Sequence, residues 1–131
     1  MREVLIWSPE MSVGDEQIDV QHRKLLDTAN MVRRLNDTTD SEIVKAAICE
    51  VFDYTIEHFF FEEMLLMSAG YADLAAHKAL HDAIREEVFA VSANPDAVTH
   101  EILNEVMDRV IRHILITDRD YVASIGHVAG H

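Results

Sequence analysis

Seven histidine and acidic side chains stand at spacings that suit metal ligation. Two pairs are four residues apart, His58 with Glu62 and His77 with His81, and Asp118 follows closely after His113. Residues i and i+4 of an α-helix lie about 40° and one turn apart, so both members of a pair can face one point. Imidazole and carboxylate donors that converge in a dry interior indicate a metal site. The candidate ligands are His22, His58, Glu62, His77, His81, His113 and Asp118.

The seven residues together indicate a metal site more strongly than any one of them does alone. A single histidine is more often a core or surface residue than a ligand. Buried carboxylates, however, are costly unless they are paired or bound to metal. Seven donors are too many for one ion and suit two ions that share bridging carboxylates. A set without thiolate favours iron or manganese, although zinc remains open.

One spacing in the set requires an irregular helix. His113 and Asp118 are separated by five positions, which places them about 140° apart on a regular α-helix. Both can reach one cluster only if the helix ends, kinks or carries a π-bulge between them. We therefore expect an irregularity near Ile116 and Thr117.

Four segments with the apolar period of an α-helix position these residues. We expect helices over about 19–35, 40–68 and 73–93, and no strand pattern competes. Short connections favour antiparallel neighbours, so the fold class is all-α, an up-down-up-down four-helix bundle. In that topology all seven candidate ligands fall at the same end of the bundle. The fourth helix has apolar residues at Ile102, Leu103, Val106, Val110 and Ile114.

Local signals predict the helix ends. Asp19 is a suitable N-cap for the first helix, and Thr39 with Glu42 has the spacing of a capping box for the second. Gly70 suits the position after the second helix, and Asp96 can cap the fourth. We expect one domain over 1–131, with a non-helical arm over 1–17, the bundle over 18–118 and a C-terminal tail over 119–131.

Composition restricts the partners and the compartment. Eleven Lys and Arg stand against 24 Asp and Glu, giving a net charge of −13. Such a surface repels nucleic acid and anionic lipid headgroups. No apolar run is long enough for membrane insertion, and the N-terminus does not read as a signal peptide. With Cys49 as its one cysteine, the chain suits a reducing, cytoplasmic setting. We expect Cys49 and the six methionines to fill the core.

These residues, in this order, resemble the hemerythrin family, and in particular the single-domain bacteriohemerythrins. The resemblance covers nearly the whole chain. Its motifs are Trp7 with Gly14, Ile18-Asp19-x-Gln21-His22, His58-Phe59-x-x-Glu62-Glu63, Tyr71 with His77-x-x-x-His81, and His113-Ile114-x-x-x-Asp118.

The resemblance implies a non-haem di-iron site that binds O2 reversibly, with two Fe ions (Fe2+/Fe3+) and an oxo or hydroxo bridge. By this likeness three histidines hold one iron, His22 and His58 hold the other and leave it an open position, and Glu62 and Asp118 bridge the two. The three histidines are His77, His81 and His113. The implied function is O2 storage, or delivery to an oxygen-consuming enzyme, without catalysis.

Four apolar residues lie one turn or less from predicted ligands and are candidates for an O2 pocket, a role compatible with ordinary core packing: Leu25, Phe59, Val110 and Ile114. Three other possibilities stay open: sensing of O2, NO or redox state through the arm, detoxification of peroxide or NO or an iron reservoir, and a structural zinc site. We expect a monomer.

Several further residues carry weaker expectations. Asp19 and Gln21 could support ligand histidines by accepting their second ring N–H. Trp7 could shield the cluster or anchor the arm. We expect Glu63 to be solvated and the three histidines outside the spacing pattern to be exposed. These are His100, His127 and His131.

Overall fold

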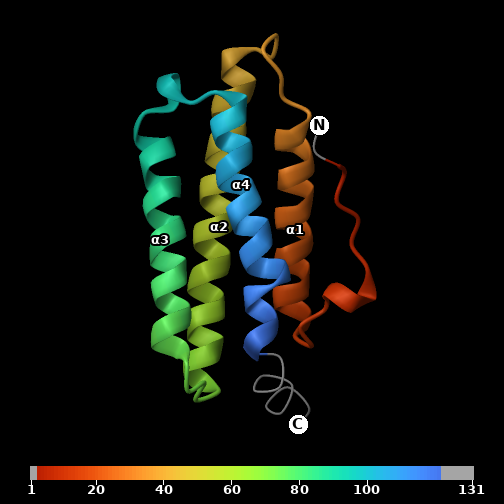
Figure 1. Ribbon diagram of the computed structural model, residues 1–131, viewed down its shortest axis with the longest axis vertical. Coiled ribbons are helices and arrows are strands. Elements are labelled where there is room, and N and C mark those ends of the chain that lie inside the picture. Colours follow the sequence, from red (N-terminus) through yellow and green to blue (C-terminus); the bar gives the residue numbers. More distant parts are fainter. Residues whose placement is uncertain (1–2, 122–131) are drawn as a thin grey trace.

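The computed structural model describes residues 3–121, and within that range it contains helices and no strand. Successive long helices run in opposite directions (Figure 1), which confirms the predicted up-down-up-down bundle. The α-helices are α1 (Glu16–Arg33), α2 (Ser41–Ser68), α3 (Leu74–Ala93) and α4 (His100–Leu115). Three short 3-10 helices accompany them: η1 (Pro9–Met11), η2 (Pro95–Ala97) and η3 (Thr117–Tyr121).

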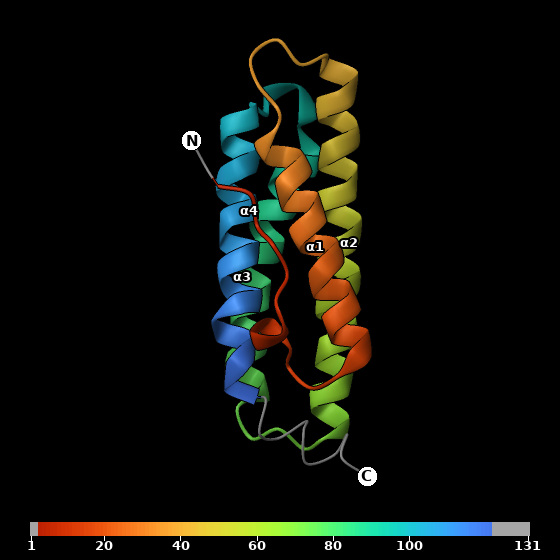
Figure 2. The ribbon, with the colours of Figure 1, turned by 90° about the vertical axis from the view of Figure 1, so that its right-hand side faces the viewer.

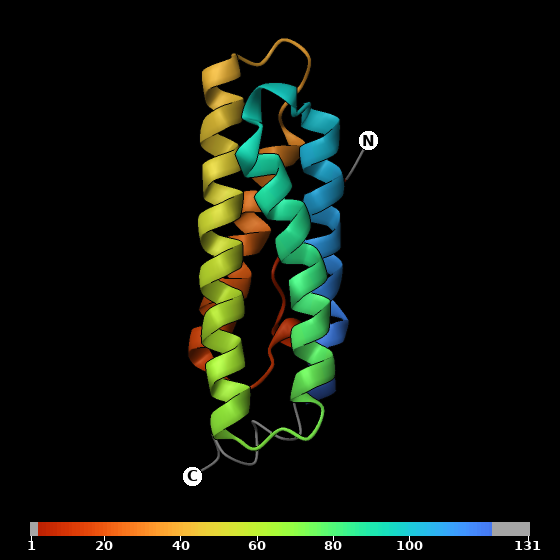
Figure 3. The same ribbon diagram turned by 90° about the vertical axis from the view of Figure 1, so that its left-hand side faces the viewer.

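Helices α1 and α3 each pack against two neighbours, and α2 and α4 also touch each other across the bundle. Helix α1 contacts α2 and α4, and α3 contacts the same two helices from the other side (Figure 3). The large apolar cluster extends along the bundle from Leu25 and Ile114 to Leu35 and Leu103. A smaller one closes the end where α1 begins and comprises Val13, Ile18, Leu66 and Tyr121. None of the helices within residues 3–121 combines the length and apolar character needed to cross a membrane.

Helix α1 begins earlier than predicted. Its N-cap is Asp15, whose side chain accepts a hydrogen bond from the backbone N–H of Ile18. The chain turns immediately before it at Gly14, where φ is +87°, a conformation that glycine adopts without strain. The prediction that Asp19 caps α1 is therefore wrong, because the helix is already formed at that residue. Two neighbouring aspartates are both suitable caps, and only the turn decides between them.

The predicted capping box of α2 is also wrong. Asp40 is the N-cap and accepts from the N–H of Glu42. The hydroxyl of Thr39 instead accepts from the N–H of Asn36, which closes the loop before the helix. At the other end of α2 the prediction is confirmed, since Gly70 adopts a φ of +67°.

Helix α4 is capped by Thr99, whose hydroxyl accepts from the N–H of Ile102. Asp96, the predicted cap, lies in η2 and is paired with Lys45 of α2 at 3.1 Å. The 3-10 helix that begins at Pro95 includes Asp96 and Ala97, so α4 begins later than the sequence pattern predicts.

The N-terminal arm lies along the bundle beside α1 and α4 (Figure 2). The side-chain amide of Asn30 accepts a hydrogen bond from the backbone N–H of Leu5 and donates one to the backbone carbonyl of Leu5, both at 2.8 Å. Trp7 and Met11 pack partly buried on the large apolar cluster. These contacts support the anchoring role of Trp7. The arm contains one turn of 3-10 helix and ends at Asp15, two residues before the predicted boundary.

One expectation about the core is wrong, and another is confirmed only in part. Cys49 is exposed on α2. Of the methionines, Met107 is buried, but Met64 and Met67 are 45% and 57% exposed. Residue type gives only an average tendency to be buried, and the rotation of α2 about its axis turns these three positions outward.

Candidate metal centre

Seven donor side chains meet at the end of the bundle where α1 and α3 begin and α2 and α4 end. All are at most 4% exposed, as core residues are. Each of the four α-helices contributes at least one donor, so the donors lie at one end of the bundle, as the topology predicts. The set comprises His22 from α1, His58 and Glu62 from α2, His77 and His81 from α3, His113 from α4 and Asp118 from η3.

The break after α4 positions Asp118. The helix ends at Leu115, Ile116 is its C-cap, and η3 begins at Thr117. The tighter 3-10 turn carries the carboxylate back over the last turn of α4, so that Asp118 Oδ1 lies 2.9 Å from His113 Nε2. The irregularity predicted near Ile116 and Thr117 is thereby confirmed.

Glu62 offers a different oxygen to each side of the cluster. Its Oε1 lies 2.6 Å from His77 Nε2 and 3.0 Å from His81 Nε2. Its Oε2 lies 3.1 Å from His58 Nε2 and 3.9 Å from His22 Nε2. One carboxylate therefore faces two separate pairs of imidazoles.

Asp118 is divided in the same way. Its Oδ1 faces His77 and His113 at 3.1 and 2.9 Å, and its Oδ2 faces His22 and His58 at 3.1 and 3.6 Å. The donor atoms consequently form two groups, each within 4.8 Å and able to hold a metal ion, that share both carboxylates. One group is Glu62, His77, His81, His113 and Asp118, and the other is His22, His58, Glu62 and Asp118.

Hydrogen bonding within the cluster is incomplete in a way that suits metal. His81 Nε2, His113 Nε2 and Asp118 Oδ1 are buried without a hydrogen-bond partner among residues 3–121. Acceptor or donor atoms lie about 3 Å away, so these atoms are close together but not aligned for hydrogen bonds. A buried polar atom without a partner is costly, and a cation between the donors satisfies all three.

The charges of the donors depend on one another. Burial lowers the pKa of His58 and of His77, but hydrogen bonds and the charges of Asp118 and Glu62 outweigh it and raise each to about 9. Burial and the Asp118 charge act to raise the pKa of Glu62, yet its histidine partners, His58 and His77 first among them, lower it to about 2. Burial likewise opposes ionisation of Asp118, but its histidine partners lower its pKa well below normal. At neutral pH the centre without metal therefore holds two ionised carboxylates beside two protonated imidazoles, and a metal ion that binds there takes the place of those protons.

Three residues contact the donors or their partners in ways that the sequence did not predict: Glu63, Arg85 and Tyr121. Glu63, expected to be solvated, accepts a hydrogen bond from His81 Nδ1 at 2.7 Å and pairs with Arg85 at 2.6 Å. The hydroxyl of Tyr121 donates to Glu62 Oε2 at 2.9 Å. These contacts join residues 18 to 59 positions apart, and spacing within one helix contains no sign of them.

The expectations for Gln21 and Asp19 have different outcomes. Gln21 Oε1 accepts from His58 Nδ1 at 2.7 Å, as predicted. The carboxylate of Asp19 instead binds the arm, where it accepts from the N–H of Val13 and the hydroxyl of Ser12.

The four apolar pocket candidates are at most 1% exposed. Phe59 stacks on the ring of His81, with centroids 3.9 Å apart and an interplanar angle of 8°. Leu25, Val110 and Ile114 belong to the large apolar cluster that borders the centre. The surroundings of the donors on this side are therefore dry and apolar.

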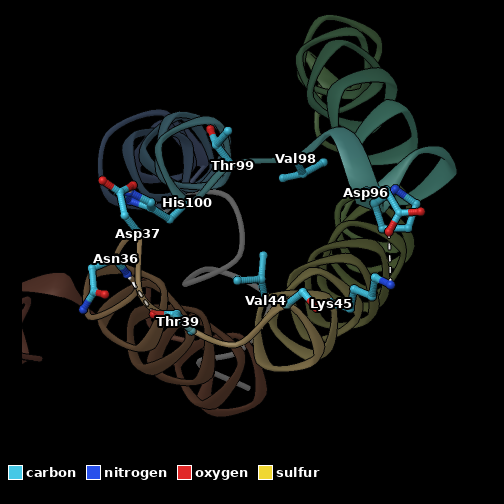
Figure 4. Close-up of a pocket in the computed structure, with 11 residues that line it drawn as sticks. Asn36, Asp37, Thr39, Val44, Lys45, Asp96, Val98, Thr99 and His100 are labelled. Atoms are coloured by element: carbon cyan, nitrogen blue, oxygen red, sulfur yellow. Dashed lines mark hydrogen bonds and ion pairs between the residues drawn. The ribbon is translucent and has the colours of Figure 1, made fainter.

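A separate pocket of about 270 Å³ lies at the opposite end of the bundle (Figure 4). Two ion pairs border it: His100 with Asp37 at 2.8 Å and Lys45 with Asp96 at 3.1 Å. His100 is thus half-buried rather than exposed, and it fastens the α1–α2 connection to α4. His127 and His131 lie outside the described residues. This pocket shares no residue with the donor cluster.

A buried cluster of histidines and carboxylates inside four antiparallel helices defines a metal-binding bundle protein. The model of one such family, the Hemerythrin HHE cation binding domain, matches residues 13–125. The bacteriohemerythrin of Clostridium acetobutylicum is 30% identical over 128 residues, which cover 91% of this chain and 99% of that protein. That of Stenotrophomonas maltophilia is 36% identical over 85 residues, covering 65% of this chain and 56% of that protein. A crystal structure of wild-type hemerythrin matches with a TM-score of 0.83 at 26% identity, covering 95% of this chain and 99% of that one.

The chain belongs to the hemerythrin family, because the family model covers most of its length. Proteins of this family are generally di-iron O2-binding proteins and not typically enzymes. The donors described above fit two iron ions, since imidazoles and carboxylates suit iron and two shared carboxylates can join a pair of ions.

Proposed function

We propose that this chain binds O2 reversibly at a di-iron centre and serves O2 storage or delivery to an oxygen-consuming enzyme. His77, His81 and His113 would hold one iron, and His22 and His58 the other. Glu62 and Asp118 would bridge them, together with an oxo or hydroxo group. Two ferrous ions held there would supply the two electrons that reversible O2 binding requires, and the protein would provide positioning and a dry environment.

The unequal division of the donors carries this proposal. One group has five protein donors and the other has four. At octahedral iron, a bridging oxygen would complete the five-donor side and leave about one position free on the four-donor side. A free position beside His22 and His58 is what an external ligand such as O2 needs.

The apolar side chains close to the donors favour binding over reaction. Leu25, Phe59, Val110 and Ile114 carry no proton donor, and all are buried. A water-poor pocket without a general acid offers reduced oxygen no proton from a side chain. Under this proposal the pocket keeps O2 binding reversible by withholding protons and water.

Anaerobic reduction followed by exposure to air tests the proposal. A visible absorption band should appear with O2 and bleach when O2 is removed, over repeated cycles. Rapid, irreversible oxidation without such a band would overturn reversible binding. Metal analysis of the same sample should give two irons per chain.

The pocket can be tested with one matched pair of variants. Val110→Thr replaces a methyl group with a hydroxyl at nearly constant volume, one turn from His113, and should shorten the lifetime of the coloured form severalfold. Val106→Thr makes the same change one turn further from the centre, at another buried position of α4, and should leave the lifetime unchanged. Equal lifetimes in the two variants would argue against a protective pocket.

A sensing role is the second candidate, because the arm is hydrogen-bonded to two residues that lie close to donors in the sequence. Asp19, three residues before His22, binds Ser12 and Val13 of the arm. Arg119, next to Asp118, donates to the carbonyl of Glu10. Hydrogen exchange of residues 3–13 in ferrous protein, with and without O2 or NO, tests this role. Equal exchange in all states would exclude signalling through the arm.

A further inference from the structure

The outward-facing nitrogens of the ligand histidines are supported unequally. His81 Nδ1 donates to the carboxylate of Glu63 at 2.7 Å. His58 Nδ1 donates to the neutral amide oxygen of Gln21, also at 2.7 Å. His22 Nδ1 is buried and finds no acceptor among residues 3–121. Within residues 3–121, His81 of the five-donor group therefore has a charged acceptor, whereas the two histidines of the four-donor group have one neutral acceptor between them.

The Glu63 carboxylate is held firmly in place. Its Oε2 receives both the His81 N–H and the Arg85 guanidinium, at 2.7 and 2.6 Å. Its side chain is 15% exposed and that of Arg85 is 16% exposed, so water competes little for these bonds. Arg85 also pairs with Asp82 at 2.9 Å, but the Asp82 side chain is 59% exposed, so this surface pair restrains the guanidinium little.

The ring of His81 is restrained on its face as well as at its edge. Phe59 stacks on it at 3.9 Å, and the Arg85 guanidinium lies 5.5 Å from the centroid of the same Phe59 ring. Glu63 only accepts in this contact, so the proton of His81 must reside on Nδ1. Nε2 then faces the donor cluster, where it can bind a metal ion.

We propose that Glu63, fixed by Arg85, is a positioning residue that makes the five-donor group the tighter of the two metal sites. The inference rests on the proposed di-iron function. A carboxylate draws the Nδ1 proton more strongly than an amide does, which makes Nε2 a better electron donor to metal. Changes to such supporting partners typically cost about 10- to 100-fold in metal affinity. The ion held by His22 and His58 should accordingly dissociate first.

Stepwise metal removal from the intact protein tests this inference. Ferrous protein is titrated anaerobically with a chelator, and native mass spectrometry counts chains with two, one and no iron. Wild-type protein should pass through a one-iron form. Glu63→Gln keeps the size and an acceptor oxygen but removes the charge. It should weaken the tighter site about 10- to 100-fold and suppress the one-iron form.

Two further variants make the result specific. Gln21→Glu places a charged acceptor behind His58 and should strengthen the weaker site by a comparable factor. Asp82→Asn removes the outer partner of Arg85 without touching His81 and should behave as wild type does. Unfolding of each metal-free variant, followed by circular dichroism, separates metal affinity from folding.

The outcomes separate the inference from the proposed function. If Glu63→Gln weakens both sites equally, or neither, the positioning role of Glu63 is refuted while O2 binding stands. If the iron-loaded wild type shows two-step iron loss but no reversible absorption band, O2 binding fails and the role of Glu63 is retained. Wild-type protein that binds no iron would refute both.

Discussion

At the scale of single residues, the two carboxylates of the centre each have their oxygens directed to different histidines. This division leaves little freedom, because a rotation that favours one side withdraws an oxygen from the other. Glu62 has an additional restraint in Tyr121, whose hydroxyl donates to Oε2. Burial, together with the charges of Asp118 and Glu62, raises the pKa of Tyr121 above its usual range, so the phenol stays protonated and keeps donating.

Tyr121→Phe should destabilise the metal-free protein by about 1.5–3 kcal/mol, the value of a hydrogen bond to a charged group. The ring remains to fill the space, so the loss reports the hydroxyl alone. Urea unfolding measures it, with Tyr54→Phe, a half-buried tyrosine of α2 that is not bonded to the cluster, as the control. A Tyr121→Phe variant as stable as wild type would mean that the bond to Glu62 contributes nothing.

At the scale of the elements, the ends of the helices position the donor side chains. The connection from α2 to α3 is short, and it must bring His77 and His81 opposite Glu62. It begins with a Schellman motif, in which Tyr71 N–H bonds the carbonyl of Leu66 and Gly70 N–H bonds that of Met67. Gly70 at φ +67° makes this reversal possible.

Gly70→Ala should lower the free energy of unfolding by about 1–2 kcal/mol, because a Cβ is disfavoured in the left-handed region. Space is not the cause, since no atom lies within 4 Å of an added Cβ. Gly70→Asn should lose less, because asparagine tolerates this conformation. Thermal and urea unfolding compare the two, and equal losses would contradict the conformational explanation.

At the scale of the whole molecule, the two ends of the bundle are stabilised by different means. The end with the donors joins all four α-helices and η3 through polar contacts among buried groups. The opposite end relies on the apolar cluster and on two surface ion pairs between connecting segments. Stability without metal should therefore follow the protonation of the donor cluster.

The metal-free protein should lose stability between about pH 6.5 and pH 9. The pKa values of His58 and His77 rise from 6.5 to about 9 on folding, so their contribution is complete below pH 6.5 and is lost as the pH rises through 9. The pKa of Glu62 falls from 4.5 to about 2, so its contribution is present above pH 4.5 and is lost as the pH falls through 2. His22 partly opposes its neighbours below pH 6.5, because burial lowers its pKa.

Urea unfolding at pH 6.5, 7.5 and 9 measures this dependence. Iron-loaded protein is the control and should not lose stability over this range, because histidines that bind metal are already deprotonated. A metal-free protein whose stability rises toward pH 9 would show that the donor histidines are not charged in the folded state.

Periodic spacing within helices predicted the fold class, the paired donors and the break after His113, and the short connections predicted the alternating direction of the helices that places His22 at the same end. These features are encoded within one or two turns of chain, where the helix itself fixes which residues share a face. The same reasoning failed at the N-caps near Asp19, Thr39 and Asp96, because several neighbouring side chains can each cap and the preceding turn selects one.

Only the tertiary structure determined which oxygen of each carboxylate faces which histidines. It brought Glu63 of α2 into hydrogen-bonding distance of His81 of α3. It also turned Cys49 outward and paired His100 with Asp37. Such contacts depend on how far each helix is rotated and shifted against its neighbours. Packing over the whole bundle sets that rotation, and no short stretch of sequence contains it.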